Sequence, residues 1–266
     1  MPEPDRTLPV GSYAYSLANF SNKLAIRARR SSDNAEIDLY AQEITDGKLI
    51  SWAQGGNVFV TTRYDQGENN MHFTQTATAS QPRIVNSGAL ETLSGGLPAI
   101  NFAGAVLVGS ISVTANKTFF FVHQPPVNVN TSGPFYYLLL GTNAQISVGG
   151  GDNGTIGEVT LNQTASPFNG YYNTSALAAN TKYLDVHTTS LSPFKMRRNK
   201  SNLTVAQLRA GGSVGITSLI GIGQTAAQTT ANKISEVIVF NTVFASTAPG
   251  SEFDQIESEI ATYYGI

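Results

Sequence analysis

The sequence contains no cysteine and few charged residues, and these two shortages limit its chemistry and its partners. Without cysteine there can be no disulfide, no thiolate metal ligand and no cysteine nucleophile. Asp, Glu, Lys and Arg make up 13% of the 266 residues, and the formal net charge is −2. A near-neutral chain lacks the basic stripe that nucleic-acid binding requires, so we expect no nucleic-acid partner.

Long apolar runs are also missing. None approaches the roughly 20 residues that a membrane-spanning helix needs, so we expect no membrane insertion. The first residues, "MPEPDRTLPVGS", lack the basic start and apolar stretch that are typical of a signal peptide. Their proline content predicts an extended arm over residues 1–11, and residues 12–266 are predicted to form a single domain.

What the sequence has instead is a series of short β-strand patterns. "LAIRARR", "AEIDLYA" and "NVFVTTRYD" come first, after a short helical turn predicted near "SYAYS". Runs rich in β-branched and aromatic residues follow, such as "KTFFFVHQ", "KYLDVHTTS" and "KISEVIVFN", with Gly, Pro, Asn or Ser between them. This spacing predicts an all-β protein built as a two-sheet sandwich or a barrel.

One convincing helix ends the chain, in "SEFDQIESEIATYYGI". Ser251 and Asp254 have the spacing of a capping box, and Gly265 suits the C-terminal cap. Apolar residues recur at helical spacing and predict a stripe that packs on the sandwich: Phe253, Ile256, Ile260 and Tyr263.

Two short basic stretches, "RARR" (27–30) and "KMRRNK" (195–200), are interpreted as the outer faces of strands. The glycine-rich segment 148–157 resembles a phosphate loop only superficially, because strand patterns flank it and a phosphate loop needs a helix behind it.

The segment "YDQGENNMH" after the third strand is dense in polar groups. Asp65, Glu68, Asn69 and Asn70 could offer oxygens to calcium, but their spacing does not match a known calcium loop. Because Asp and Asn favour tight turns, the segment is predicted to be architectural, with Asp65 paired to Arg63 or to an arginine of "RARR". The residues assigned to this turn and ion pair are Asp65, Asn69, Asn70, Arg29 and Arg30.

Catalytic patterns are sparse. His72, His123 and His187 do not have the spacing of a zinc site. Glycoside hydrolysis needs two facing carboxylates, and the middle of the chain offers few. The candidates are Asp152, Glu158 and Asp185, for which the alternative interpretation is surface acids.

Sugar binding without catalysis needs aromatic platforms together with fixed amide and carboxylate groups. The glycine-rich segment and "FNGYYNTS" offer such groups. The candidate ligand-binding residues are Asp152, Asn153, Tyr171, Tyr172 and Asn173. The tyrosines could equally belong to the core.

Two N-terminal segments carry a resemblance. "AYSLANFSNKLAIRARRSSDNAEIDLY" and "FVTTRYDQGENNMHFTQ" resemble the opening of the arabinofuranosidase-B type catalytic domain and of related concanavalin-A-like, laminin-G-like jelly rolls of phages and bacteria. The C-terminal strand and helix are similar to the end of those folds. The resemblance implies a jelly roll with a C-terminal helix. It does not carry an active site, because the family's catalytic segment and cysteine-bearing sugar pocket have no counterpart here.

On these grounds the sequence favours a non-enzymatic surface module of a phage particle that adheres to host or environmental glycans. The expected partners are other virion subunits, with homo-oligomerisation, and the expected location is the virion surface or else the extracellular space. No cofactor is expected, with calcium as an alternative. The competing functions are a glycoside hydrolase of arabinofuranosidase type and a bacterial adhesin domain.

Overall fold

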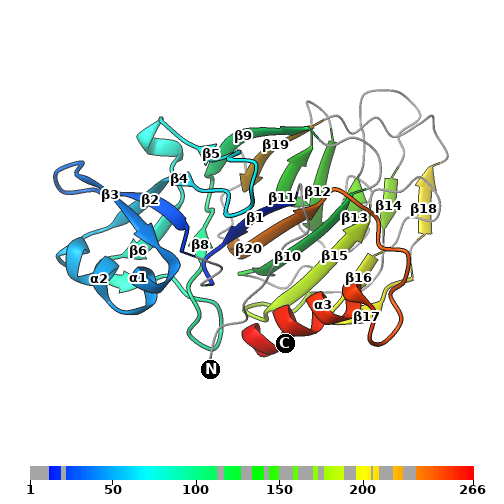
Figure 1. The fold of residues 1–266 in the computed structure, drawn as a ribbon. Helices are drawn as coiled ribbons and strands as arrows, with labels where there is room; N and C mark the ends of the chain where they lie inside the picture. The colour runs from blue at the N-terminus through cyan, green and yellow to red at the C-terminus, as the bar shows by residue number, and fades with distance from the viewer. Residues whose placement is uncertain are drawn as a thin grey trace.

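The computed structural model describes residues 12–18, 22–112, 117–126, 134–140, 144–149, 158–160, 170–172, 177–188, 196–204, 206–209, 218–223 and 232–266. The predicted arm, residues 1–11, lies outside them. Within the described residues the protein is mostly β, with a large antiparallel sheet and a C-terminal helix. This confirms the all-β prediction at that level (Figure 1).

Seventeen described strands form one hydrogen-bonded sheet, within which two long runs can be followed. The first run is β3–β2–β4–β5–β9–β19–β11–β12, and the second is β1–β20–β10–β15–β16–β17. β6 and β8 connect β4 to β20, and β7 pairs with β6. β13, β14 and β18 form a separate small sheet.

The first run consists of β3 (Glu36–Tyr40), β2 (Leu24–Arg30), β4 (Val58–Arg63), β5 (Phe73–Thr74), β9 (Val106–Ser112), β19 (Ser218–Gly223), β11 (Pro134–Leu140) and β12 (Ala144–Gly149). The second consists of β1 (Tyr13–Ser16), β20 (Lys233–Phe240), β10 (Thr118–Gln124), β15 (Tyr183–Thr188), β16 (Met196–Arg198) and β17 (Ser201–Asn202). The others are β6 (Arg83–Asn86), β7 (Ala89–Leu90), β8 (Ile100–Asn101), β13 (Glu158–Thr160), β14 (Gly170–Tyr172) and β18 (Ala206–Arg209).

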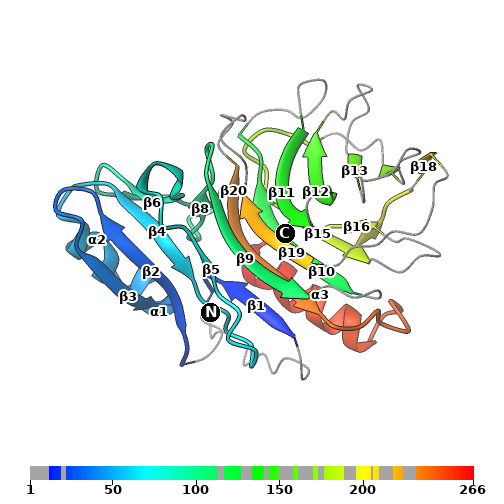
Figure 2. The ribbon, with the colours of Figure 1, turned by 90° about the horizontal axis from the view of Figure 1, so that it is seen from above.

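The described helices are α1 (Ala41–Thr45), α2 (Lys48–Ala53), the single 3₁₀ turn η1 (Thr78–Ser80) and α3 (Glu252–Tyr264). Figure 2 shows α1 and α2 beside β2 and β3 at one end of the molecule, with β11, β12, β13 and β18 at the other. The sequence did not predict α1 or α2. It also predicted a helical turn near "SYAYS", which was wrong, because these residues form β1 and pair with β20.

The middle strands of the second run are buried on both faces, which explains the apolar runs FFFV in β10 and VIVF in β20. Alternate residues of β10 enter different core clusters. Phe119 and Phe121 join the cluster that also takes residues from the first run, such as Leu107 of β9. Phe120 packs with α3 in the other cluster. We call the face that bears Phe119 and Phe121 the inner face.

Both caps that the sequence predicted for the C-terminal helix are present. Ser251 Oγ accepts the Asp254 N–H at 3.3 Å, and Gly265 ends α3 in the left-handed region at φ 63°. The Asp254 carboxylate accepts from the Gly250 N–H. The predicted stripe packs on the sheet: Phe253 and Ile260 are fully buried, and Ile256 and Tyr263 are partly buried against the same cluster. Tyr264, which the stripe did not include, is also buried.

Candidate functional site

The densest set of buried ionisable groups among the described residues lies on the inner face of β10, β15 and β16. The strand register places Asp185 opposite Phe121 on one side and opposite Arg198 on the other. His123 Nε2 lies 3.0 Å from Asp185 Oδ2. Arg198 donates to the same carboxylate from Nε at 2.7 Å and from Nη2 at 2.8 Å. We call His123, Asp185 and Arg198, with His187, the inner-face cluster.

Planar groups stack across this cluster. The His187 ring stacks on Phe121 with centroids 5.0 Å apart and an interplanar angle of 15°. The His123 ring stacks on Tyr183 at 5.8 Å, and the Arg198 guanidinium lies 5.2 Å from the centroid of the same ring. The three strands thus present a layer of flat side chains, in which His123 and Arg198 both stack on Tyr183 and bond to Asp185.

Burial controls the protonation of the cluster. The Asp185 side chain is 1% exposed, and burial alone would raise the pKa of its carboxyl. The charge of Arg198 and the hydrogen bonds from His123 and Arg198 outweigh burial and hold that pKa well below its usual value. Burial lowers the pKa of His123, despite Asp185 nearby, and lowers the pKa of His187 to about 4. At neutral pH the cluster therefore contains a carboxylate, a guanidinium and two neutral imidazoles.

These properties correct the sequence-based interpretation of Asp185. It is not a surface acid, because three strands enclose it. Its lowered pKa leaves it without a proton to donate at neutral pH, and its bidentate pairing with Arg198 occupies both oxygens. Asp185 therefore fixes the geometry and charge of its surroundings, because both of its oxygens are bonded and 1% of its side chain is exposed.

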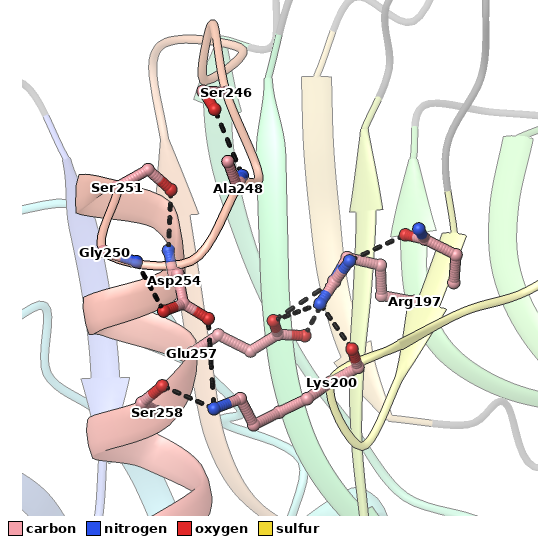
Figure 3. A network of polar contacts seen from close by, with 10 residues as sticks. Arg197, Lys200, Ser246, Ala248, Gly250, Ser251, Asp254, Glu257 and Ser258 are labelled. Carbon is pink, nitrogen blue, oxygen red and sulfur yellow. Dashed lines mark hydrogen bonds and ion pairs between the residues drawn. The ribbon is translucent and has the colours of Figure 1, made fainter.

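A second polar network fastens α3 to β16 and β17 (Figure 3). Arg197, one residue before Arg198, lies on the opposite face of β16 and donates to Glu257 of α3 from Nε at 3.1 Å and from Nη2 at 2.9 Å. Its Nη1 also donates to Asn202 Oδ1 at 2.7 Å. Lys200 donates to Ser258 Oγ at 2.7 Å. We call this set the α3 latch.

The latch corrects the interpretation of "KMRRNK" as the outer face of a strand, because Arg197 and Arg198 are 8% exposed and each is paired with a buried acid. Sequence reasoning missed Glu257 as a partner. A signal was present: in α3, Phe253, Glu257 and Ile260 recur at helical spacing, so the glutamate lies within the apolar stripe. An acid there requires a buried cation opposite it.

The polar segment after β4 contacts strand β1. Asp65 Oδ1 accepts the N–H groups of Ala14 at 3.0 Å and Gly67 at 2.8 Å, and Oδ2 accepts that of Met71 at 3.3 Å. Among the described residues Asp65 makes no ion pair, so the predicted pairing with an arginine was wrong. Arg63 instead donates from Nη2 to the carbonyls of Tyr15 and Ser235, each at 2.6 Å.

The same contacts occupy the oxygens of Asp65 that were considered as calcium ligands. The Asp65 oxygens already accept three N–H groups, and Asn69 Nδ2 donates to Ser12 O at 2.9 Å. Asn70 adopts a left-handed backbone at φ 52°, which suits a tight turn. Across the described part of the chain, no three His, Asp or Glu side chains are arranged to hold a metal ion.

The two assigned arginines of "RARR" have other partners. Arg29 donates to Gln81 Oε1 at 2.7 Å and lies over the Phe59 ring. Arg30 pairs with Asp33 at 2.7 Å and lies over the Trp52 ring. Both arginines are therefore anchored within the end of the molecule that contains α1 and α2.

Of the five candidate ligand-binding residues, only the two tyrosines belong to the described residues. Asp152, Asn153 and Asn173 lie outside the described residues. Tyr171 and Tyr172 lie in β14, whose backbone pairs with β13 so that Tyr172 stands opposite Glu158. The register thus brings one candidate acid and one candidate aromatic residue to the same position of the small sheet.

No helix in the described residues is long and apolar enough to cross a membrane.

Comparisons with known proteins find structural likeness only. No protein-family model matches the sequence, and neither does any curated protein. A GH54 α-L-arabinofuranosidase soaked with a cyclic sulfate inhibitor matches with a TM-score of 0.59 and 12% identity, over 93% of this chain and 62% of that one. An arabinofuranosidase complexed with arabinofuranosyl-α-1,2-xylobiose matches with a TM-score of 0.54 and 11% identity, over 93% of this chain and 61% of that one. The chain thus spans somewhat under two thirds of these enzymes, and likeness at this identity establishes the fold alone.

The comparisons reverse the order of the predicted functions. The non-enzymatic virion module was the leading prediction and the arabinofuranosidase-type hydrolase the second, but the structures reported above, which match with TM-scores above 0.5, are arabinofuranosidases. The leading prediction was therefore wrong. The prediction that the chain is not an enzyme has no support either. The adhesin alternative, the virion or extracellular location and the homo-oligomer stay untested predictions.

Proposed function

We propose that this chain is a glycoside hydrolase domain that cleaves α-L-arabinofuranosyl side groups from a polysaccharide. The main support is the likeness to GH54 arabinofuranosidases, which extends over 93% of the chain. The N-terminal segments described above add support, since they resemble the opening of the arabinofuranosidase-B type domain. The finer fold assignment, a two-sheet jelly roll, is part of this proposal.

The reaction requires one carboxylic acid to protonate the leaving oxygen and one carboxylate to act as nucleophile or base. Of the three acids in the middle of the chain, Asp185 is enclosed in the inner-face cluster and is not available. Glu158 and Asp152 are left as the candidate pair. The β13–β14 register places Glu158 opposite Tyr172, so a candidate acid and a candidate aromatic residue occupy paired positions of the small sheet.

In this proposal the inner-face cluster has a positioning role. Asp185, Arg198 and His123 fix β10, β15 and β16 to one another and set a constant local charge at neutral pH. Their substitution should lower stability and activity together, whereas substitution of a catalytic carboxylate should lower activity alone.

The test is hydrolysis of 4-nitrophenyl α-L-arabinofuranoside by the purified chain and by Glu158→Gln and Asp152→Asn. We expect turnover by the wild type and a loss of at least 100-fold in one or both variants, with thermal midpoints unchanged. Glu252→Gln, an exposed acid on α3, is the control and should keep full activity. No turnover by a folded wild type on this substrate or on arabinoxylan, or full activity in both carboxylate variants, would refute the proposal.

A further inference from the structure

Another group of planar side chains lies on β2, β3 and the end of β4. These strands lie at the opposite end of the molecule from β13 and β14 (Figure 1). Tyr64 directly follows β4, and its N–H donates to the carbonyl of Ala25 on β2 at 3.0 Å. Its Oη donates to Asp38 Oδ1 on β3 at 2.7 Å. Because β2 pairs with β3 on one side and β4 on the other, the Tyr64 side chain crosses over β2. The ring is therefore fixed at both ends while it stays partly exposed.

Groups that can bind hydroxyls adjoin this ring. Arg27 donates to Asp38 from Nε and Nη2, both at 2.8 Å, and the two side chains are 43% and 34% exposed. The charges of Arg27 and Asp38 offset each other, and exposed Glu36, two residues before Asp38 on β3, adds a negative charge that acts on both Arg27 and Tyr64. Burial and the hydrogen bond to Asp38 raise the pKa of Tyr64 to about 12, so its hydroxyl keeps its proton and remains the donor to Asp38.

His72 closes one edge of the platform. Its ring meets the Tyr64 ring edge-on, with centroids 4.9 Å apart. His72 Nδ1 accepts the Asp65 N–H at 3.1 Å, so in the neutral ring the proton lies on Nε2. Tyr40, 42% exposed, lies two residues after Asp38 on β3, and the strand period places it on the same face.

We propose that Tyr64, with Arg27, Asp38 and His72, forms a subsite that binds a neutral polysaccharide chain, separate from the catalytic centre. The apolar C–H face of a sugar ring would pack on the Tyr64 ring, and its hydroxyls would bind Arg27 and Asp38. Because Arg27 is paired with Asp38 and Glu36 lies nearby, the surface disfavours an acidic ligand, and a neutral polysaccharide fits it. The side chains are already held by one another, so binding costs little additional ordering.

The choice of a polysaccharide rests on the proposed function, whereas the geometry of the subsite does not. In an enzyme that trims side groups, such a subsite would keep the polymer attached between cleavages. Affinity would then depend on Tyr64 for long chains only, because a single arabinofuranoside bound at a distant catalytic centre does not reach β2.

The subsite can be tested by affinity electrophoresis of the full chain in native gels that contain soluble arabinoxylan, with glycan-free gels as reference. We expect arabinoxylan to retard the wild type, and Tyr64→Ala to weaken binding at least tenfold. Tyr64→Phe keeps the ring and should bind within about threefold of the wild type. Tyr263→Ala, a partly exposed tyrosine on α3, is the matched control and should bind like the wild type.

Each outcome separates the subsite from the catalytic proposal. If Tyr64→Ala loses binding to the polymer but hydrolyses 4-nitrophenyl α-L-arabinofuranoside normally, both proposals hold. If the wild type binds arabinoxylan through Tyr64 but hydrolyses nothing, the subsite stands and the catalytic proposal fails. If a folded wild type is not retarded, or if Tyr64→Ala and Tyr263→Ala are retarded equally, the subsite is refuted. Should Tyr64→Ala not fold, a Tyr64→Phe variant that no longer binds would refute stacking on the ring.

Discussion

The buried histidine His187 should make the folded state sensitive to mild acid. Its pKa in the fold is about 4, against about 6.5 in the unfolded chain, because burial disfavours the charged ring. Between these two values the unfolded chain binds a proton that the folded chain does not, so acidification favours unfolding. The free energy of unfolding should fall by about 1.4 kcal/mol for each pH unit in this window, about 3 kcal/mol in total, and should not change above pH 7 on account of this group.

Replacing His187 with phenylalanine isolates this contribution. A phenyl ring can keep the stack on Phe121, which is 15° from parallel to the imidazole, but it cannot titrate. The assay is urea unfolding of both proteins at pH 7.0, 5.5 and 4.5, with equal m-values as the criterion for comparison. We expect the wild type to lose about 2.4 kcal/mol more than His187→Phe between pH 7.0 and pH 4.5, because the pH stays above the folded pKa of about 4.

The lowered pKa of His123 adds acid sensitivity of the same sign to both proteins, so only the difference between them reports on His187. Leu184→Ala is the control for destabilisation, because it removes buried apolar volume and no titrating group. Its stability should be lower at every pH, with the wild-type dependence on pH. The reasoning would be refuted if His187→Phe and the wild type lost equal stability on acidification.

Two further substitutions test the contacts that hold β1 and α3. A Cβ at Gly67 would lie 2.3 Å from the carbonyl oxygen of Ser12, so Gly67→Ala should cost about 1–3 kcal/mol in urea unfolding, and more than Gly56→Ala, whose Cβ would lie 3.3 Å from its nearest neighbour. Equal losses would argue against the close approach of β1. Glu257→Gln leaves Arg197 without its charged partner and should cost about 3 kcal/mol, whereas the exposed Glu252→Gln should cost less than about 0.5 kcal/mol. A loss below 1 kcal/mol at Glu257 would show that the α3 latch contributes little.

Local patterns predicted much of the strand content and the terminal helix. β10 contains the run FFFV and β20 the run VIVF, both aromatic and β-branched, and α3 has both of its predicted caps. β1 was not predictable from local sequence, because Tyr13–Ser16 become a strand through pairing with β20, more than 200 residues later. α1 and α2 are five and six residues long, and helices this short depend on packing more than on propensity.

The candidate site was harder to predict, because its residues are brought together by strand register. His123 and Asp185 are 62 residues apart in the chain, and their contact depends on β10 and β15 aligning without a one-residue slip. Their individual sequence contexts look like ordinary strands. The Tyr64 platform has the same origin, since Asp38 and Tyr64 meet only because β2 lies between their strands.

The chain's shortage of charge and lack of cysteine explain how its arginines are used. Within the part of the chain that the structure describes, four arginines lie over aromatic rings at 4.9–5.4 Å: Arg29 over Phe59, Arg30 over Trp52, Arg197 over Phe253 and Arg198 over Tyr183. Each also donates hydrogen bonds in the plane of its guanidinium. A planar group that stacks and donates at once fixes distance and direction between neighbouring elements, which a lysine ammonium cannot do. In a protein without disulfides, these arginines supply directional links between elements that apolar packing alone leaves less specific.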